Sequence, residues 1–63
     1  MPLIKELRRK RGLSQESAAV AIGISVKSLS DYENKKTQPS TKTLEALADF
    51  YGVTTDELLG RTS

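Results

Sequence analysis

The side chains with the most varied chemistry in this chain lie between residues 25 and 31. By helical spacing from Leu29 and Tyr32, which should face inward, the outward set is Ser25, Val26, Lys27, Ser30 and Asp31. Hydroxyl, ammonium and carboxylate groups donate or accept hydrogen bonds, and a valine can pack on a methyl group. Such a set is typical of a surface that recognises a partner by hydrogen bonds and shape.

Catalysis is not indicated by the same inventory. The 63 residues contain no histidine and no cysteine, so the commonest general base near neutral pH and the best thiol nucleophile are both missing. Thiolate metal sites and disulfides are excluded as well. A serine–lysine pair is conceivable, but no base that would activate a serine is evident. We predict that the chain is not an enzyme and needs no metal or cofactor.

The stretch from Gln15 to Asn34, QESAAVAIGISVKSLSDYEN, indicates two short helices joined by a tight turn at Gly23. Ala18 and Ala19 are small enough to let the first helix press against the second. A connection this short makes the helices cross steeply, which is the pattern of a helix-turn-helix unit. The second helix of such a unit can lie in a DNA major groove.

Start and stop signals place this pair within a larger helical bundle. Ser14, Ser25, Ser40 and Thr54 are suitable N-caps, and glycines follow four of the apolar stretches. We expect an all-α fold, a compact bundle of five short helices that forms a single domain over residues 1–63. The expected helices cover about 2–11, 15–22, 26–33, 41–51 and 55–59.

The core of such a bundle must be small. Apolar spacing predicts that ten residues are buried together: Ile4, Leu7, Leu13, Ala19, Ile22, Leu29, Leu44, Leu47, Val53 and Leu58. Phe50, Tyr51, Leu58 and Leu59 are interpreted either as core or as contacts to a second copy.

Charge is unevenly distributed along the chain. Residues 1–42 contain nine Lys/Arg and four Asp/Glu, a local charge of +5, whereas residues 43–63 contain one and four, a local charge of −3. A basic region suits a polyanion, although charged stretches are also ordinary solvated faces. No apolar run approaches the length of a membrane span or the core of a secretory signal, so a cytoplasmic location is expected.

The chain resembles the phage-repressor and Cro-like helix-turn-helix family, also called the XRE family. The resemblance rests on GLSQE at 12–16, A-x-x-x-G at 19–23, S-x-x-x-LS-x-YEN at 25–34, PS at 39–40, L-x-x-LA-x-x-YGV at 44–53 and DELL at 56–59. It implies the lambda-repressor-like fold, with the helix at 26–33 as the recognition helix. It also implies sequence-specific binding of double-stranded DNA by a bacterial or phage-encoded, nucleoid-associated transcriptional regulator, with repression as the expected mode.

For the outward residues of the recognition helix, each side chain has an expected base contact. Val26 can pack on a thymine methyl, Lys27 can reach guanine acceptors or a phosphate, and Asp31 can accept from a cytosine amino group. Asp31 can alternatively exclude wrong sites or pair with a lysine. The glutamine and arginine side chains that usually read bases are absent from the central outward positions, so DNA shape should contribute to specificity.

Phosphate contacts are expected on both sides of this helix. In members of the family, the residue matching Gln15 touches the DNA backbone and braces the recognition helix, and a helix N-terminus is itself an anion site. Backbone amides and ammonium groups after the helix could clamp a phosphate strand. The alternative is an ordinary cap and solvated turn. The full predicted set is Ser14, Gln15, Asn34, Lys35, Lys36, Thr37 and Lys42.

The resemblance also implies a structural ion pair between Arg8 and Glu33, partly buried, which would fix the recognition helix against the first helix. Arg9, Lys10 and Arg11 are interpreted as a solvated basic cluster. The family implies a homodimer on a palindromic operator. The alternative function is a protein-interaction module on the same fold, such as an antitoxin or anti-repressor, which the weak set of base-reading side chains would favour.

Overall fold

The computed structural model describes residues 2–60, so the predicted domain extends beyond the described part at residues 1 and 61–63. Five helices form this part of the chain: α1 (Pro2–Lys10), α2 (Gln15–Ile22), α3 (Val26–Glu33), α4 (Thr41–Tyr51) and α5 (Thr55–Leu59). The predicted all-α bundle is confirmed. The first helix ends one residue earlier than expected, because Arg11 already belongs to the turn. Within residues 2–60, no helix is long and apolar enough to cross a membrane.

Helices α2, α3, α4 and α5 begin at hydroxyl caps. Ser14, Ser25, Ser40 and Thr54 each have extended backbone angles, and each side chain accepts a hydrogen bond from the backbone N–H three residues later. This contact satisfies one of the N–H groups that a helix start leaves without an intrahelical partner. At the last cap, the Glu57 carboxylate accepts a hydrogen bond from the Thr54 backbone N–H and completes a capping box.

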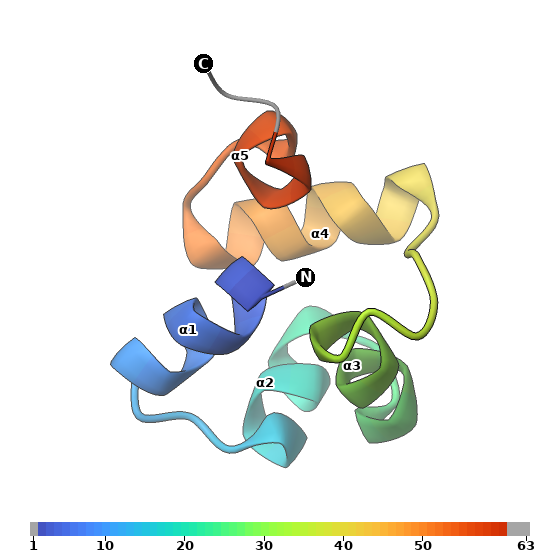
Figure 1. Ribbon diagram of the computed structural model, residues 1–63. Coiled ribbons are helices and arrows are strands. Elements are labelled where there is room, and N and C mark those ends of the chain that lie inside the picture. The colour runs from blue at the N-terminus through green and yellow to red at the C-terminus, as the bar shows by residue number, and fades with distance from the viewer. Residues whose placement is uncertain (1, 61–63) are drawn as a thin grey trace.

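The helices stack around a small centre (Figure 1). α4 lies across the bundle, with α1 and α2 on one side of it and α5 on the other. α1 contacts α3 and α4, while α2 contacts α3 and α4. The largest fully buried side chains are Ile4, Leu29 and Leu47, which come from three different helices. The recognition helix predicted from sequence therefore rests on α1 and α2.

The buried centre differs in part from the predicted core. It comprises Ile4, Ala18, Ala19, Leu29, Leu47, Ala48, Tyr51 and Leu58. Five predicted members are only partly buried and pack against its outside: Leu7, Leu13, Ile22, Leu44 and Val53. Ala18, Ala48 and Tyr51 are buried in addition to the predicted members. The two alanines are enclosed completely or almost completely because small side chains let helices approach closely, whereas the five larger side chains lie at the margins of the contacts.

Candidate nucleic-acid interface

The unit formed by α2 and α3 depends on a three-residue connection. Gly23 has a left-handed backbone with φ of 92°, and its N–H donates to the carbonyl of Ala19 at 2.8 Å. The N–H of Ile24 donates to the same carbonyl at 3.0 Å. Ala18 and Ala19 are fully buried, which leaves room for α3 to pack against α2. This packing fixes the direction in which α3 emerges.

The start of α3 is open to solvent. Ser25, Val26 and Lys27 are all exposed, as their helical spacing predicts. Ser25 uses its hydroxyl as the helix cap: the oxygen accepts from the Ser28 backbone N–H at 3.0 Å, and the hydroxyl donates to the Ser28 hydroxyl at 2.9 Å. Val26 offers an apolar side chain that is 41% exposed.

The second turn of α3 is less open than expected. Asp31 accepts a hydrogen bond from the Lys27 ammonium, with Nζ and Oδ2 3.2 Å apart. The Asp31 side chain is only 22% exposed, whereas that of Lys27 is 86% exposed. Ser30 is half-buried. Asp31 is therefore less exposed than expected, and its contact with Lys27 matches one alternative, pairing with a lysine. Its contact with a base stays a prediction.

A buried carboxylate joins the first three helices. Arg8 Nε lies 2.8 Å from Glu33 Oε2, and Arg8 Nη2 lies 3.2 Å from Glu33 Oε1. Gln15 Nε2 donates to the same Oε1 at 3.0 Å. The Glu33 side chain is fully buried and that of Arg8 is 11% exposed. The structure thus brings together Arg8, Gln15 and Glu33, one each from α1, α2 and α3.

The electrostatic balance in this cluster favours the charged carboxylate. Burial alone would raise the pKa of Glu33, but the hydrogen bonds from Arg8 and Gln15, together with the positive charges of Arg8 and Lys5, lower it below its ordinary value. The hydrogen bond to Glu33 raises the pKa of Arg8 despite the opposing effect of burial. Arg8 also donates to the Leu13 carbonyl at 2.8 Å, which ties the cluster to the turn before α2.

The end of α3 has an unusual residue in a familiar turn. The Lys36 N–H donates to the Asp31 carbonyl at 2.9 Å, and the Lys35 N–H donates to the Tyr32 carbonyl at 3.3 Å. These two contacts form a Schellman motif, in which Lys35 occupies the left-handed position with φ of 61°. The corresponding glycines at the ends of the other helices are Gly12, Gly23, Gly52 and Gly60.

This turn changes how the loop after α3 can bind an anion. The backbone N–H groups of Asn34, Lys35 and Lys36 all donate to carbonyls of α3. These three amides are therefore engaged within the helix end, so the ammonium groups are the accessible part of the predicted phosphate clamp, which stays a prediction. The side chains of Asn34, Lys35, Lys36 and Thr37 are exposed, as is Lys42 in the first turn of α4.

The two predicted phosphate contacts at the start of α2, Ser14 and Gln15, both use their side chains within the protein. The hydroxyl of Ser14 caps the helix through the Ser17 N–H and donates to the Ser17 hydroxyl at 3.0 Å. Gln15 is half-buried and its amide nitrogen donates to Glu33, so the side chain braces α3. A phosphate at this end would meet the backbone of Ser14 and Gln15.

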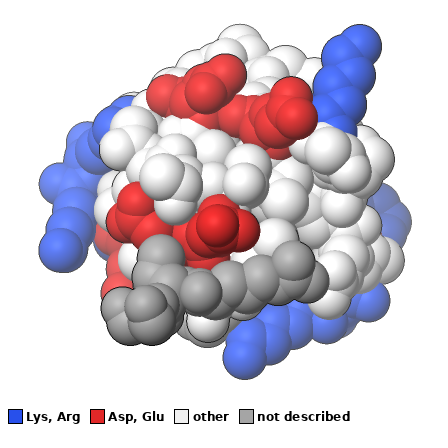
Figure 2. Space-filling view, turned by 90° about the horizontal axis from the view of Figure 1, so that it is seen from above, with Lys and Arg blue, Asp and Glu red and all other residues white. Residues whose placement is uncertain are grey.

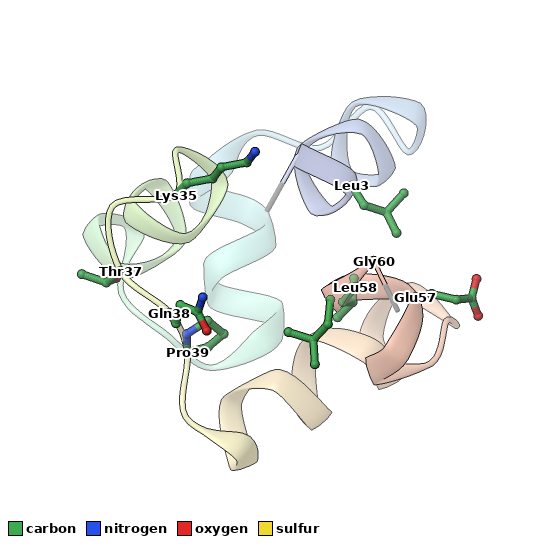
Figure 3. Close-up of a pocket in the computed structure, with 9 residues that line it drawn as sticks. Leu3, Lys35, Thr37, Gln38, Pro39, Glu57, Leu58 and Gly60 are labelled. Atoms are coloured by element: carbon green, nitrogen blue, oxygen red, sulfur yellow. The ribbon is translucent and has the colours of Figure 1, made fainter. Parts of the chain in front are cut away.

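A groove of about 370 Å³ lies behind the loop after α3 (Figure 3). Leu3 of α1, Pro39 of the loop, and Leu58 and Leu59 of α5 supply its apolar walls. Lys35 lies at its edge.

Arg11 is exposed, as expected of the basic cluster, but it also makes specific contacts with α4. Its Nη1 donates to the Phe50 carbonyl at 2.7 Å, and its guanidinium carbon lies 5.3 Å from the ring centroids of both Phe50 and Tyr51. The guanidinium therefore makes cation–π contacts that fasten the turn after α1 to the end of α4. Arg9 and Lys10 remain exposed. Sequence reasoning missed this role because Arg11 stands in a run of four basic residues.

Two of the four candidates for contact with a second copy lie in the core. Tyr51 is 4% exposed and Leu58 is 5% exposed, so neither offers surface to a partner. Phe50 and Leu59 are half-buried and keep part of their side chains accessible.

Acidic and basic side chains occupy different parts of the surface, as they do different parts of the sequence. Figure 2 looks down on the molecule from the side of α5 and shows acidic side chains gathered on this face, with basic side chains at its edges. Glu45 and Asp49 belong to α4, and Asp56 and Glu57 belong to α5. A polyanion would be repelled by this face and attracted to the opposite part of the bundle.

Comparisons with known proteins agree with this geometry. A family model described as helix-turn-helix matches residues 4–58. The chain is 48% identical over 56 residues to the HTH-type transcriptional regulator DdrOP3 of Deinococcus deserti, which covers 89% of this chain and 43% of that protein.

Two other relatives have similar names. The HTH-type transcriptional regulator ImmR of Bacillus subtilis is 43% identical over 58 residues, covering 92% of this chain and 46% of ImmR. The cryptic phage CTXphi transcriptional repressor RstR of Vibrio cholerae is 41% identical over 56 residues, covering 89% of this chain and 50% of RstR. The chain thus spans about half the length of these relatives.

Proposed function

This chain belongs to the XRE-type helix-turn-helix family, and from that premise we propose that it binds double-stranded DNA sequence-specifically as a transcriptional regulator. Repression is the expected mode, since RstR is named a transcriptional repressor. The mechanism would be occlusion of a promoter by bound protein, with α3 in the major groove. No step of this mechanism involves catalysis.

The observation that carries the proposal is the exposed N-terminal turn of a rigidly held α3. Ser25, Val26 and Lys27 face solvent, while Leu29 on the inner side is fully buried. The opposite end of the helix is fixed because Glu33 binds Arg8 of α1 and Gln15 of α2. A helix supported in this way can enter a groove without first becoming ordered, which lowers the entropic cost of binding.

Phosphate contacts on either side would set the register of α3 on the duplex. We propose that the backbone at Ser14 and Gln15 holds one strand. The exposed side chains after α3 and in the first turn of α4 would hold the other strand: Asn34, Lys35, Lys36, Thr37 and Lys42. Such contacts supply affinity, whereas base contacts supply sequence preference.

We further propose that the protein acts as a homodimer on a palindromic operator in the cytoplasm. One copy has a longest dimension of 31 Å and presents one α3, so it meets a single half-site. Two copies related by a twofold axis would place their recognition helices in successive major grooves, roughly 34 Å apart.

The decisive experiment is in vitro selection from a pool of random duplexes, followed by anisotropy titration of the selected site at several salt concentrations. We expect an enriched sequence with inverted half-sites. The affinity should fall with a log–log slope of about −0.9 for each phosphate neutralised. Absence of any enriched sequence, together with a protein that copurifies stoichiometrically, would instead support the interaction module.

A further inference from the structure

We propose that α3 reads its half-site chiefly through a methyl group, with Val26 packed on the C5-methyl of one thymine. This inference rests on the proposed function and deepens it, because it names the base feature that is recognised. The hydrogen-bonding side chains around Val26 would then adjust the affinity for neighbouring bases or exclude some of them. They would not supply the main preference.

The first argument is the position of Val26. Among the described side chains, the exposed large hydrophobic ones are Val20, at 76%, and Val26, at 41%. Val26 is the first residue of α3, and the N-terminal residues of a recognition helix are those that meet base edges. A branched side chain also has few accessible rotamers, so its methyl groups are presented at little entropic cost.

The second argument is that the neighbouring polar groups have partners within the helix. The Ser25 hydroxyl is engaged with Ser28 as the helix cap. The ammonium of Lys27 binds the carboxylate of Asp31. A base that recruited the Ser25 hydroxyl would have to compete with Ser28 for it. The Lys27 ammonium keeps two further donors, but the 86% exposed side chain would have to become ordered to reach a base, which lowers the net free energy of that contact.

The third argument comes from the bases. In the major groove the C5-methyl group distinguishes thymine from the other three bases. Uracil presents the same carbonyl acceptor, O4, but lacks the methyl group. 5-Methylcytosine has the methyl group at the same ring position, with an amino donor in place of O4. These analogues separate methyl contact from hydrogen bonding at a single position.

The experiment uses the operator obtained by selection. Each thymine is replaced in turn by deoxyuridine, symmetrically in both half-sites, and the dissociation constant is measured by anisotropy. We expect one symmetric position at which the loss of the methyl group weakens binding about fourfold per half-site. In V26A the same replacement should have no effect, because the apolar contact is already lost.

The matched control is V20A, which truncates the more exposed valine on α2. Its sensitivity to deoxyuridine should equal that of the unchanged protein, and circular dichroism should show both variants folded. At the sensitive position, 5-methylcytosine should bind more tightly than cytosine to the unchanged protein but not to V26A.

Failure of this inference is distinguishable from failure of the proposed function. If selection yields no operator, the proposed function is wrong. If an operator exists but no thymine is sensitive to loss of its methyl group, or V26A retains the sensitivity, the assignment to Val26 is overturned while DNA binding stands.

Discussion

At the scale of single residues, Lys35 has the least favourable backbone for its type. It is the non-glycine residue with positive φ among residues 2–60. A side chain in this conformation costs about 1 kcal/mol relative to glycine. A lysine here is explained if its charge serves binding, because strain that persists in a fold is often associated with a functional site.

The first prediction follows from that strain. K35G should raise the free energy of unfolding by about 1 kcal/mol and the melting temperature by about 4–8 °C. It should also weaken DNA binding and reduce the salt slope by about one unit, because one ammonium is lost. Thermal melting and anisotropy titration check the two effects. K36G is the control, since it removes the same charge from a residue without positive φ and should weaken binding without stabilising the fold.

The cluster at Glu33 leads to a second prediction. R8A would leave the buried carboxylate without its ion-pair partner, which typically costs about 3–5 kcal/mol. This cost approaches the whole stability of a domain of this size. Urea denaturation should therefore show a large fall in midpoint, whereas R9A on the exposed side of α1 should change it little.

A compensating variant tests the cause of that loss. In R8M/E33M both charged partners are replaced by apolar groups of similar length, so no buried charge remains unpaired. We expect this variant to recover much of the stability lost in R8A. A double variant as unstable as R8A would show that packing or the lost hydrogen bonds with Leu13 and Gln15, and not the unpaired charge, explain the effect.

Acidification provides a third prediction. The pKa of Glu33 is lower in the folded chain than its ordinary value of 4.5, so the folded state binds fewer protons than the unfolded state in that pH range. The stability from this group is therefore present above about pH 4.5 and is lost as the pH falls through the lowered pKa. The difference in unfolding free energy between the unchanged protein and E33Q should shrink below pH 4.5. E45Q, on the exposed surface, should show no comparable trend.

Not all of these residue roles could be predicted from the sequence. Arg8 and Glu33 were paired through the family resemblance, since their separation of 25 positions leaves no local signal. Lys35 lacks the glycine that marks other helix ends, and Arg11 looks like its basic neighbours. Both roles depend on contacts that appear only when distant segments meet.

At the scale of the helices, prediction from sequence was more successful because the signals are local. Ser14, Ser25, Ser40 and Thr54 lie next to the helices they cap, and each acts through an N–H three residues away. The core was predicted less well. Helical spacing identifies the inward face of each helix, but the distance between two helices decides whether an alanine or a leucine is fully enclosed.

The contact between α2 and α3 gives a fourth prediction. A19L would insert three extra carbons where the side chain is fully buried, which should cost about 1–3 kcal/mol or more and tilt α3. A21L makes the same change at an exposed position of the same helix and should alter stability by less than about 0.5 kcal/mol. Equal melting temperatures for the two variants would contradict the close approach of α2 and α3.

At the scale of the whole molecule, the dimensions limit what one copy can do. The longest dimension, 31 Å, is shorter than the roughly 34 Å between half-sites one helical turn apart. The acidic face on α4 and α5 would also be directed away from the duplex (Figure 2). The length favours two copies that bind side by side, and the acidic face favours an orientation with α4 and α5 away from the duplex.

A fifth prediction concerns this arrangement. Insertion of five base pairs between the half-sites of a selected operator turns one of them to the opposite side of the duplex. We expect binding of the second copy to lose its cooperativity, whereas insertion of ten base pairs should restore the relative orientation. Analytical ultracentrifugation of the complex would give the number of copies. Equal affinity for all three spacings would indicate independent monomers.

The short turns between the helices also determine how quickly the chain can fold. Between three and seven residues separate successive helices, so the segments that must meet are near each other along the chain. Helical proteins with such local connections fold within microseconds to milliseconds. Molecules that unfold transiently should refold before a protease cuts them. The rate of degradation in the cell should then follow the equilibrium fraction of unfolded molecules. A variant that loses 1.4 kcal/mol should then be degraded about ten times faster.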